Sequence, residues 1–175
     1  EIFRNVWEVG FLGIGITEII VSMLIFIAGA IFRAFFVGRV LKWMEKLTAH
    51  TDSEIDDVLL ESLKKPLGYI PMTVALYFIA VYLPLSGMAD TFATNLVKAM
   101  IAFTIFSALA NSIAPIFQAF TSSAVLTKSM TMWLERAARI IIWIVGLGII
   151  LDIFGIQIGP LVAGLGLFSV AVALG

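Results

Sequence analysis

LVAGLGLFSVAVALG, residues 161–175, is the stretch that decides the fold, because it is uncharged and seven of its fifteen residues are Gly, Ala or Ser. Wound as a helix at about 100° per residue, it places Ala163, Leu167, Val170 and Leu174 on one stripe. Small residues flank this stripe on one side at Gly164, Ala171 and Gly175, and on the other at Gly166, Ser169 and Ala173. Small residues let membrane helices approach closely, so two small flanks indicate a helix that touches two neighbours.

Two arrangements supply such neighbours. In a ring of identical copies, each helix lies between two others and the apolar stripe faces a central pore, with Leu165, Phe168 and Val172 outside. In an ordinary helix bundle, the small residues serve only packing, because Gly and Ala are common in any transmembrane helix. The presence of two small flanks, rather than one, favours the ring.

The composition predicts an all-α membrane protein. Of the 175 residues, 61% are hydrophobic and 13% are charged, and the mean hydropathy is +1.09, whereas a soluble domain carries about 25% charged residues. About five spans of roughly 20 residues fit the length, with short loops between them. A net charge of −1 without a basic stripe outside the membrane flanks gives no indication of nucleic-acid binding.

The uncharged runs set the expected elements. Residues 1–17 predict an interfacial segment, and residues 18–157 the spans of a lipid-facing sensor, followed by the last helix at 158–175. Within the sensor, the expected spans are 18–40, 66–89, a part of 99–127, and 133–151. Arg33 can reach the headgroups from the first of these spans. Glu135 and Arg139, at the start of the fourth, have the i, i+4 spacing of an ion pair.

The polar connector 51–65 predicts an amphipathic helix at the membrane surface or against a neighbouring subunit. Thr51 and Glu54 have the spacing of a capping box. Apolar residues recur on one face at Ile55, Val58, Leu59 and Leu63. We interpret the acidic residues opposite as a solvated face rather than a cation site.

Few residues suit a chemical site. His50 is the only histidine and there is no cysteine, so we expect no metal, no cofactor and no catalytic set. Polar residues interrupt the third span at Asn111, Ser112, Pro115 and Gln118. They favour hydrogen bonds to another helix, with a kink at Pro115, over a polar substrate site.

Basic residues near the span ends predict the topology. They concentrate in the connectors at 39–65 and 128–139, whereas the opposite side holds only Arg4 and Lys98. By the positive-inside rule both connectors are cytoplasmic, the N-terminus is outside, and the last helix ends in the cytoplasm. We therefore expect a multi-pass protein of the cell inner membrane.

The run RIIIWIVGLGIILDIFGIQIGPLVAGLGLFSVAVALG, residues 139–175, resembles the small-conductance mechanosensitive channel (MscS) family over its penultimate span, outer turn and pore-lining helix. The resemblance implies that Val170 and Leu174 form two rings that close the pore, with Ala163 and Leu167 also lining it. It assigns the helix-packing positions to Gly164, Gly166, Ser169, Ala171, Ala173 and Gly175. The sequence departs from the family where Leu167 and Phe168 replace small residues and where Ser169 and Ala173 replace Gly.

The segment TDSEIDDVLLESLKKPL, residues 51–67, is similar to the connector of longer family members with extra spans. The resemblance implies a homo-heptamer in contact with membrane lipids, which opens under membrane tension and releases ions and small solutes on hypo-osmotic shock. It also implies a longer protein that continues past Gly175 into a cytoplasmic part.

A secondary transporter and a membrane scaffold without transport are the alternatives. A transporter is disfavoured because three spans carry no charge in their cores and no inverted repeat is evident.

Overall fold

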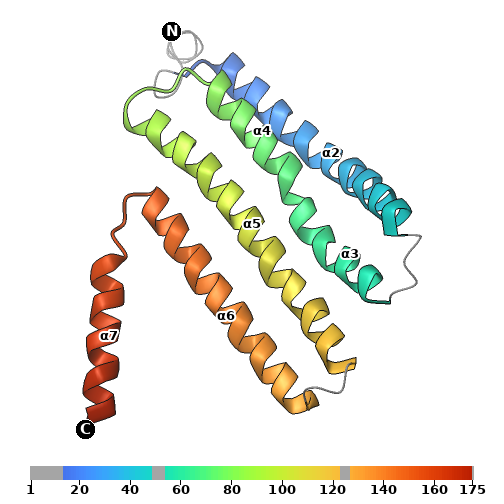
Figure 1. The fold of residues 1–175 in the computed structure, drawn as a ribbon. Helices are drawn as coiled ribbons and strands as arrows, with labels where there is room; N and C mark the ends of the chain where they lie inside the picture. Colours follow the sequence, from blue (N-terminus) through green and yellow to red (C-terminus); the bar gives the residue numbers. More distant parts are fainter. Residues whose placement is uncertain (1–13, 49–53, 123–126, 175) are drawn as a thin grey trace.

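A computed structural model describes residues 14–48, 54–122 and 127–174, which fold into a series of α-helices (Figure 1). In chain order these are α2 (Ile16–Thr48), α3 (Glu54–Leu67), α4 (Tyr69–Tyr82), α5 (Met88–Ser122), α6 (Lys128–Ile153) and α7 (Gly159–Leu174). The all-α class predicted from the composition is confirmed for this part of the chain.

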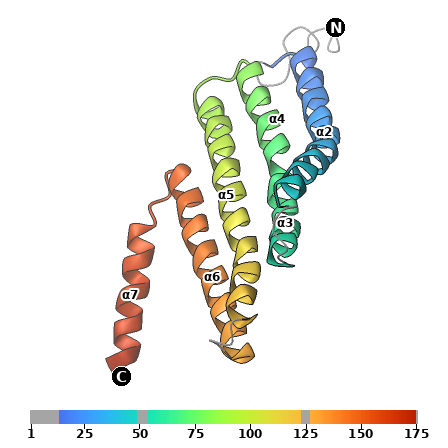
Figure 2. The same ribbon diagram turned by 45° about the vertical axis from the view of Figure 1, so that its right-hand side comes forward.

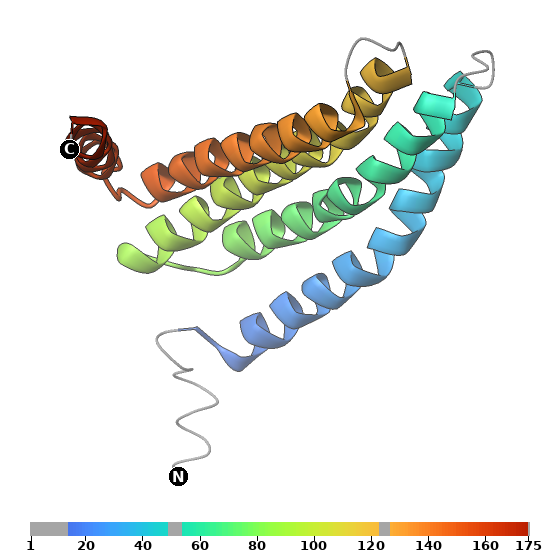
Figure 3. The ribbon, with the colours of Figure 1, turned by 90° about the horizontal axis from the view of Figure 1, so that it is seen from below.

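Helices α2 to α6 form one curved layer of antiparallel neighbours (Figures 1 and 3). Helix α2 packs against α3 and α4, these two pack against α5, and α5 packs against α6. Helix α7 stands beyond α6 at the end of the layer, as a second view confirms (Figure 2). The layer contains small side chains at its contacts, because the buried residues include Ala75, Ala99, Ala102 and Ala110.

The contact between α2 and α4 is close enough to require glycine. A Cβ atom placed on Gly29 would lie 2.5 Å from the Cβ of Ala75, which is less than the 3.5–4.0 Å at which two carbon atoms pack. Gly146 of α6 has the same relation to α5, since its Cβ would lie 2.7 Å from Cγ of Phe106. Such small-residue contacts are typical of helices that associate inside a membrane.

Helices α3 and α4 follow one another with a break at Gly68. The amide of Gly68 donates to the carbonyls of Lys64 and Lys65, at 3.3 and 3.1 Å. Helix α4 alone has 14 residues, or about 21 Å, which is shorter than the roughly 30 Å of a bilayer core. Together α3 and α4 are about twice as long, so the helical segment at the span predicted for 66–89 begins earlier in the chain and ends at Tyr82.

Two helices are long and apolar enough to cross a membrane by themselves, over Ile16–Met44 in α2 and Met88–Phe117 in α5. Helix α6 has 26 residues but includes charged residues at both ends, and α7 has 16 uncharged residues. Large apolar side chains such as Met23, Ile31 and Ile144 are exposed on the layer. An exposed apolar surface of this kind is compatible with lipid contact, so the described residues are consistent with the predicted all-α membrane protein.

The amphipathic helix predicted at 51–65 corresponds to α3. It packs against α5 of the same chain, with Leu60 buried, a contact that the sequence did not predict. Pro66 of α3 and Pro115 of α5 are both fully buried. Thr51 of the predicted capping box, His50 and the interfacial segment up to residue 13 lie outside the described residues.

The polar residues of α5 bond differently from the prediction. The side-chain amide of Asn111 donates to the Ser107 carbonyl at 2.7 Å, and the Ser112 hydroxyl donates to the Ala108 carbonyl at 2.8 Å. The expected bonds to another helix are therefore wrong for these two residues. A short polar side chain in a helix reaches the carbonyl one turn back more readily than a neighbouring helix, which is why the local bonds form.

Candidate pore helix

The turn between α6 and α7 is a helix-capping motif that needs a glycine. The amide of Ile156 donates to the Leu151 carbonyl at 3.0 Å, and the amide of Gly155 donates to the Asp152 carbonyl at 2.8 Å. These two bonds form a Schellman motif, which requires a left-handed residue after the helix. Gly155 has φ +77°, a conformation that costs other L-residues about 1–2 kcal/mol. The sequence FGIQIG thus ends α6 sharply before α7 begins.

The turn is also held against the layer. The ring of Phe154 lies 5.8 Å from the ring of Phe92 at the start of α5, measured between centroids. Ile158, just before α7, packs on α6, because its Cδ1 lies 3.2 Å from where a Cβ on Gly148 would be. The base of α7 is therefore fixed to both α5 and α6.

The body of α7 lacks such contacts. In the described chain it makes no substantial packing contact with another helix, although Val162 is 63% exposed and Leu167 is 74% exposed. A Cβ added at Gly164 or Gly166 would meet no atom within 4 Å outside its own helix backbone, in contrast to Gly29 and Gly146. Gly164 and Gly166 of α7 are thus covered by no other helix among the described residues.

The predicted pore residues all fall within α7 apart from Gly175, which lies outside the described residues. Val170 is 56% exposed and Leu174 is 83% exposed, one helical turn apart. Exposed positions also include Ala163, Leu167, Gly164, Gly166, Ala171 and Ala173. Ser169 belongs to the helix, but its side chain is outside the described set. The structure therefore places these residues on one uncovered helix, without bringing them against a partner.

One predicted electrostatic contact is confirmed at the start of α6. The guanidinium Nη2 of Arg139 donates to the Glu135 Oε1 at 2.7 Å, and the two residues are i, i+4 neighbours. Pairing reduces the cost of holding charged side chains near the membrane. Among the described residues, no group of three or more His, Cys, Asp or Glu could hold a metal ion.

Sequence reasoning missed the contacts that organise the layer. The glycines at positions 29, 146 and 155 were not singled out, and the only available signal was a small residue within or just after an apolar run. That signal is weak, because the same pattern occurs in α7, where the glycines meet nothing in the chain.

Comparison with known proteins gives two matches to the same kind of protein. The family described as "Mechanosensitive ion channel, transmembrane helices 2/3" matches residues 136–175, which cover most of α6, the turn and α7. The chain is 25% identical over 164 residues to the large-conductance mechanosensitive channel MscMJLR of Methanocaldococcus jannaschii. Both matches are to channels rather than to enzymes, in agreement with the expectation from the sequence.

The alignment with that channel covers 89% of this chain and 44% of the relative. The chain therefore spans less than half the length of this curated relative. No solved structure matched the chain.

Proposed function

We propose that the chain, which matches mechanosensitive ion channels over residues 136–175 and in its similarity to MscMJLR, forms the membrane part of a channel opened by membrane tension, with α7 lining a pore between identical chains. The open channel would release ions and small solutes on hypo-osmotic shock. The observation that carries this proposal is α7 itself, an uncharged helix whose glycines 164 and 166 meet no other part of the described chain.

The proposed membrane part has five crossings, made by α2, α3 with α4, α5, α6 and α7. Helix α6 is about 39 Å long and can cross a bilayer core of roughly 30 Å. Its ion pair between Glu135 and Arg139 lies in the N-terminal half of the helix, seven and eleven residues after Lys128. Helix α7, at about 24 Å over its described 16 residues, is slightly shorter than the core.

A ring of identical chains explains why α7 is uncovered. Membrane helices associate through packing rather than through expelling water, so small residues stabilise an assembly only where another helix meets them. Copies of α7 would supply that helix on both flanks, through Gly164 and Ala171 on one and Gly166 and Ala173 on the other. We expect seven copies, the number that the family resemblance implies.

The gate of this pore is proposed at Val170 and Leu174. In a ring, both side chains would point toward the axis, and their rings would lie one turn apart. An ion in such an apolar constriction loses its hydration and gains no polar ligand, so the closed pore excludes ions by dewetting. Ala163 and Leu167 would line the pore on the same stripe.

Tension would act through the layer of α2 to α6. Membrane tension favours the state of larger area, and so shifts an equilibrium that already exists between closed and open forms. The capped turn at Gly155 and the contact of Phe154 with Phe92 join the layer to the base of α7. Movement of the layer in the membrane would therefore displace the pore helix directly.

The proposed orientation follows from charge. Basic residues gather where α2 ends and where α6 begins, at one end of the layer, and Lys64 and Lys65 follow in the last turn of α3. The positive-inside rule assigns this end to the cytoplasm, so the chain would start outside the cell inner membrane and α7 would end in the cytoplasm.

Recording from the full-length protein in lipid vesicles under suction tests this function. A channel gives current steps that appear with tension and require no substrate. A secondary transporter gives flux that depends on a substrate gradient, and a scaffold gives neither. Vesicles without protein, held at the same suction, are the control. Substrate-dependent flux without tension-dependent current steps would refute the proposal.

A further inference from the structure

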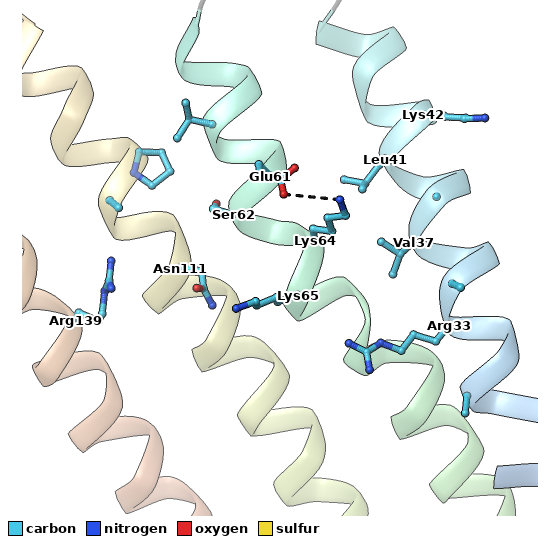
Figure 4. Close-up of a pocket in the computed structure, with 16 residues that line it drawn as sticks. Arg33, Val37, Leu41, Lys42, Glu61, Ser62, Lys64, Lys65, Asn111 and Arg139 are labelled. Carbon is cyan, nitrogen blue, oxygen red and sulfur yellow. Dashed lines mark ion pairs between the residues drawn. The ribbon is translucent and has the colours of Figure 1, made fainter. Parts of the chain in front are cut away.

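A basic groove of about 1320 Å³ lies among α2, α3, α5 and α6, away from the pore helix (Figure 4). Five basic residues line it: Arg33, Lys42, Lys64, Lys65 and Arg139. Glu61 is the one acidic residue among the lining residues, and its Oε1 is 3.7 Å from the Nζ of Lys64. The groove therefore has a large excess of positive charge.

The cations reach the groove from different helices. Figure 4 shows Arg33 extending from α2 toward the junction of α3 and α4, and Lys65 extending from α3 toward Asn111 of α5. The guanidinium Cζ of Arg33 lies 6.0 Å from the ring centroid of Tyr69, which leaves its outer N–H groups able to donate. Lys65 has no carboxylate within 4.0 Å among the described residues. These two residues are the strongest free donors for an anion.

Two polar side chains of the lining already donate within their own helices. The amide of Asn111 donates to the Ser107 carbonyl and the Ser62 hydroxyl donates to the Leu59 carbonyl, each at 2.7 Å, so the basic residues supply the donors for phosphate oxygens. Arg139 closes the side formed by α6, although it also binds Glu135. Phosphate carries several acceptor oxygens, so it can accept from several such donors at once, which a carboxylate does less fully.

The depth of the groove indicates a lipid rather than a free anion. Arg33 lies seventeen residues after Ile16, or about 25 Å along α2, and Lys42 lies about 39 Å along it. The hydrocarbon core of a bilayer is about 30 Å thick, so the charges begin where the headgroup layer begins. The remaining lining on α2 includes Ala30, before Arg33, and Ala34 and Val37, between Arg33 and Lys42, which suit the apolar part of a lipid.

We propose that this groove binds the phosphate headgroup of an anionic phospholipid, with Arg33 and Lys65 as the main ligands. The volume of about 1320 Å³ exceeds that of most small-molecule pockets and is far larger than a phosphate ion needs, in keeping with a headgroup and part of its chains. The site links the α2–α3 pair to α5 and α6, and it does not depend on α7.

The test measures lipid preference at the surface of the full-length protein. The protein is reconstituted in vesicles of equal parts phosphatidylglycerol and phosphatidylcholine, and electron spin resonance compares how strongly spin-labelled forms of the two lipids associate. Wild type should prefer phosphatidylglycerol. The double variant Arg33→Gln with Lys65→Gln should lower this preference about 5- to 30-fold, the effect of one to two basic residues at a membrane surface.

A matched double variant controls for charge alone. Arg39→Gln with Lys46→Gln removes the same charge from the same end of the layer, outside the groove lining, and should change the preference little. Lys65→Gln alone keeps Arg33, so this variant can be measured even if the loss of Arg33 causes misfolding. Glu61→Gln should raise the preference, a gain that damage to the fold would not produce. An equal loss in both double variants would overturn the proposal, since it would show only general attraction.

A second arm separates lipid from free phosphate. Inorganic phosphate is added to one sample and chloride to another at the same ionic strength. At a lipid site, the two anions should change the association of labelled phosphatidylglycerol equally. If phosphate displaced the labelled phosphatidylglycerol where chloride did not, the groove would be a site for free phosphate and the lipid assignment would be wrong. If the wild-type protein showed no preference for phosphatidylglycerol over phosphatidylcholine, the lipid assignment would also be wrong. Channel activity is not the readout, so failure here leaves the proposed pore unaffected.

Discussion

Replacement of Gly29 by Ala should destabilise the protein, whereas replacement of Gly38 by Ala in the same helix should not. The new Cβ at position 29 would lie 2.5 Å from the Cβ of Ala75, and Ala75 is 5% exposed and has no rotamer by which to move away. At position 38 a Cβ meets nothing within 4 Å. The two variants share the same gain in helix propensity, so their difference isolates the close contact between α2 and α4.

The magnitude follows from that distance. Carbon atoms pack at about 3.5–4.0 Å, so α2 and α4 must separate by about 1–1.5 Å to admit the methyl group. Overpacking of this kind costs about 1–3 kcal/mol, against a propensity gain of up to about 1 kcal/mol. Gly29→Ala should therefore be about 1–3 kcal/mol less stable than Gly38→Ala. For a chain of this length, the corresponding difference in Tm is on the order of 2 to 12 °C.

The assay is thermal unfolding of the purified protein in detergent, followed by circular dichroism. A second substitution sharpens it, because Ala75→Gly removes the opposing methyl group. In a double-mutant cycle, Ala75→Gly should cost less in the Gly29→Ala background than in wild type, by about 1–3 kcal/mol. Equal stability of Gly29→Ala and Gly38→Ala, or a coupling of zero between positions 29 and 75, would refute the packing of α2 on α4 described above.

Three further predictions concern the turn, the assembly and the topology. Gly155→Ala should destabilise the α6–α7 turn by about 1 kcal/mol, because φ is +77° there. Gly159→Ala is the control, and an equal loss of stability in both variants during thermal unfolding would contradict this prediction. Gly166→Leu should weaken the oligomer in native mass measurements by separating neighbouring copies of α7, and an unchanged subunit number and yield would count against the ring. A cysteine introduced at Met88, which is 91% exposed, should react with impermeant thiol reagents only from outside the cell, in this cysteine-free chain. Reaction from the cytoplasm alone would reverse the topology.

The class of the fold could be predicted from the sequence because composition constrains membrane helices strongly. A mean hydropathy of +1.09 and long uncharged runs leave few alternatives to membrane helices. The ion pair of Glu135 with Arg139 was also predictable, because helical spacing alone brings the two side chains together.

Contacts between distant segments could not be predicted in this way. Helix α3 packs on α5, with Leu60, Pro66 and Pro115 buried, and hydrophobic periodicity does not identify the partner of an apolar face. The bonds of Asn111 and Ser112 went to their own helix because local geometry competed with the expected interhelical bonds. For α7 the pattern of small residues predicts a helix with partners, and the described part of the chain places no neighbour at Gly164 or Gly166.

The most direct test of the pore is the tension at which single substitutions in α7 open the full-length channel. Val170→Ser and Leu174→Ser are compared with Val172→Ser, which the helical periodicity of the sequence assigns to the outer face, in patches that contain a reference channel. A polar side chain at either proposed ring should hydrate the constriction, so Val170→Ser or Leu174→Ser should open at lower tension than wild type or leak at rest, and Val172→Ser should not. A lower threshold in Val172→Ser, with both ring variants behaving as wild type, would contradict the assignment of the pore face.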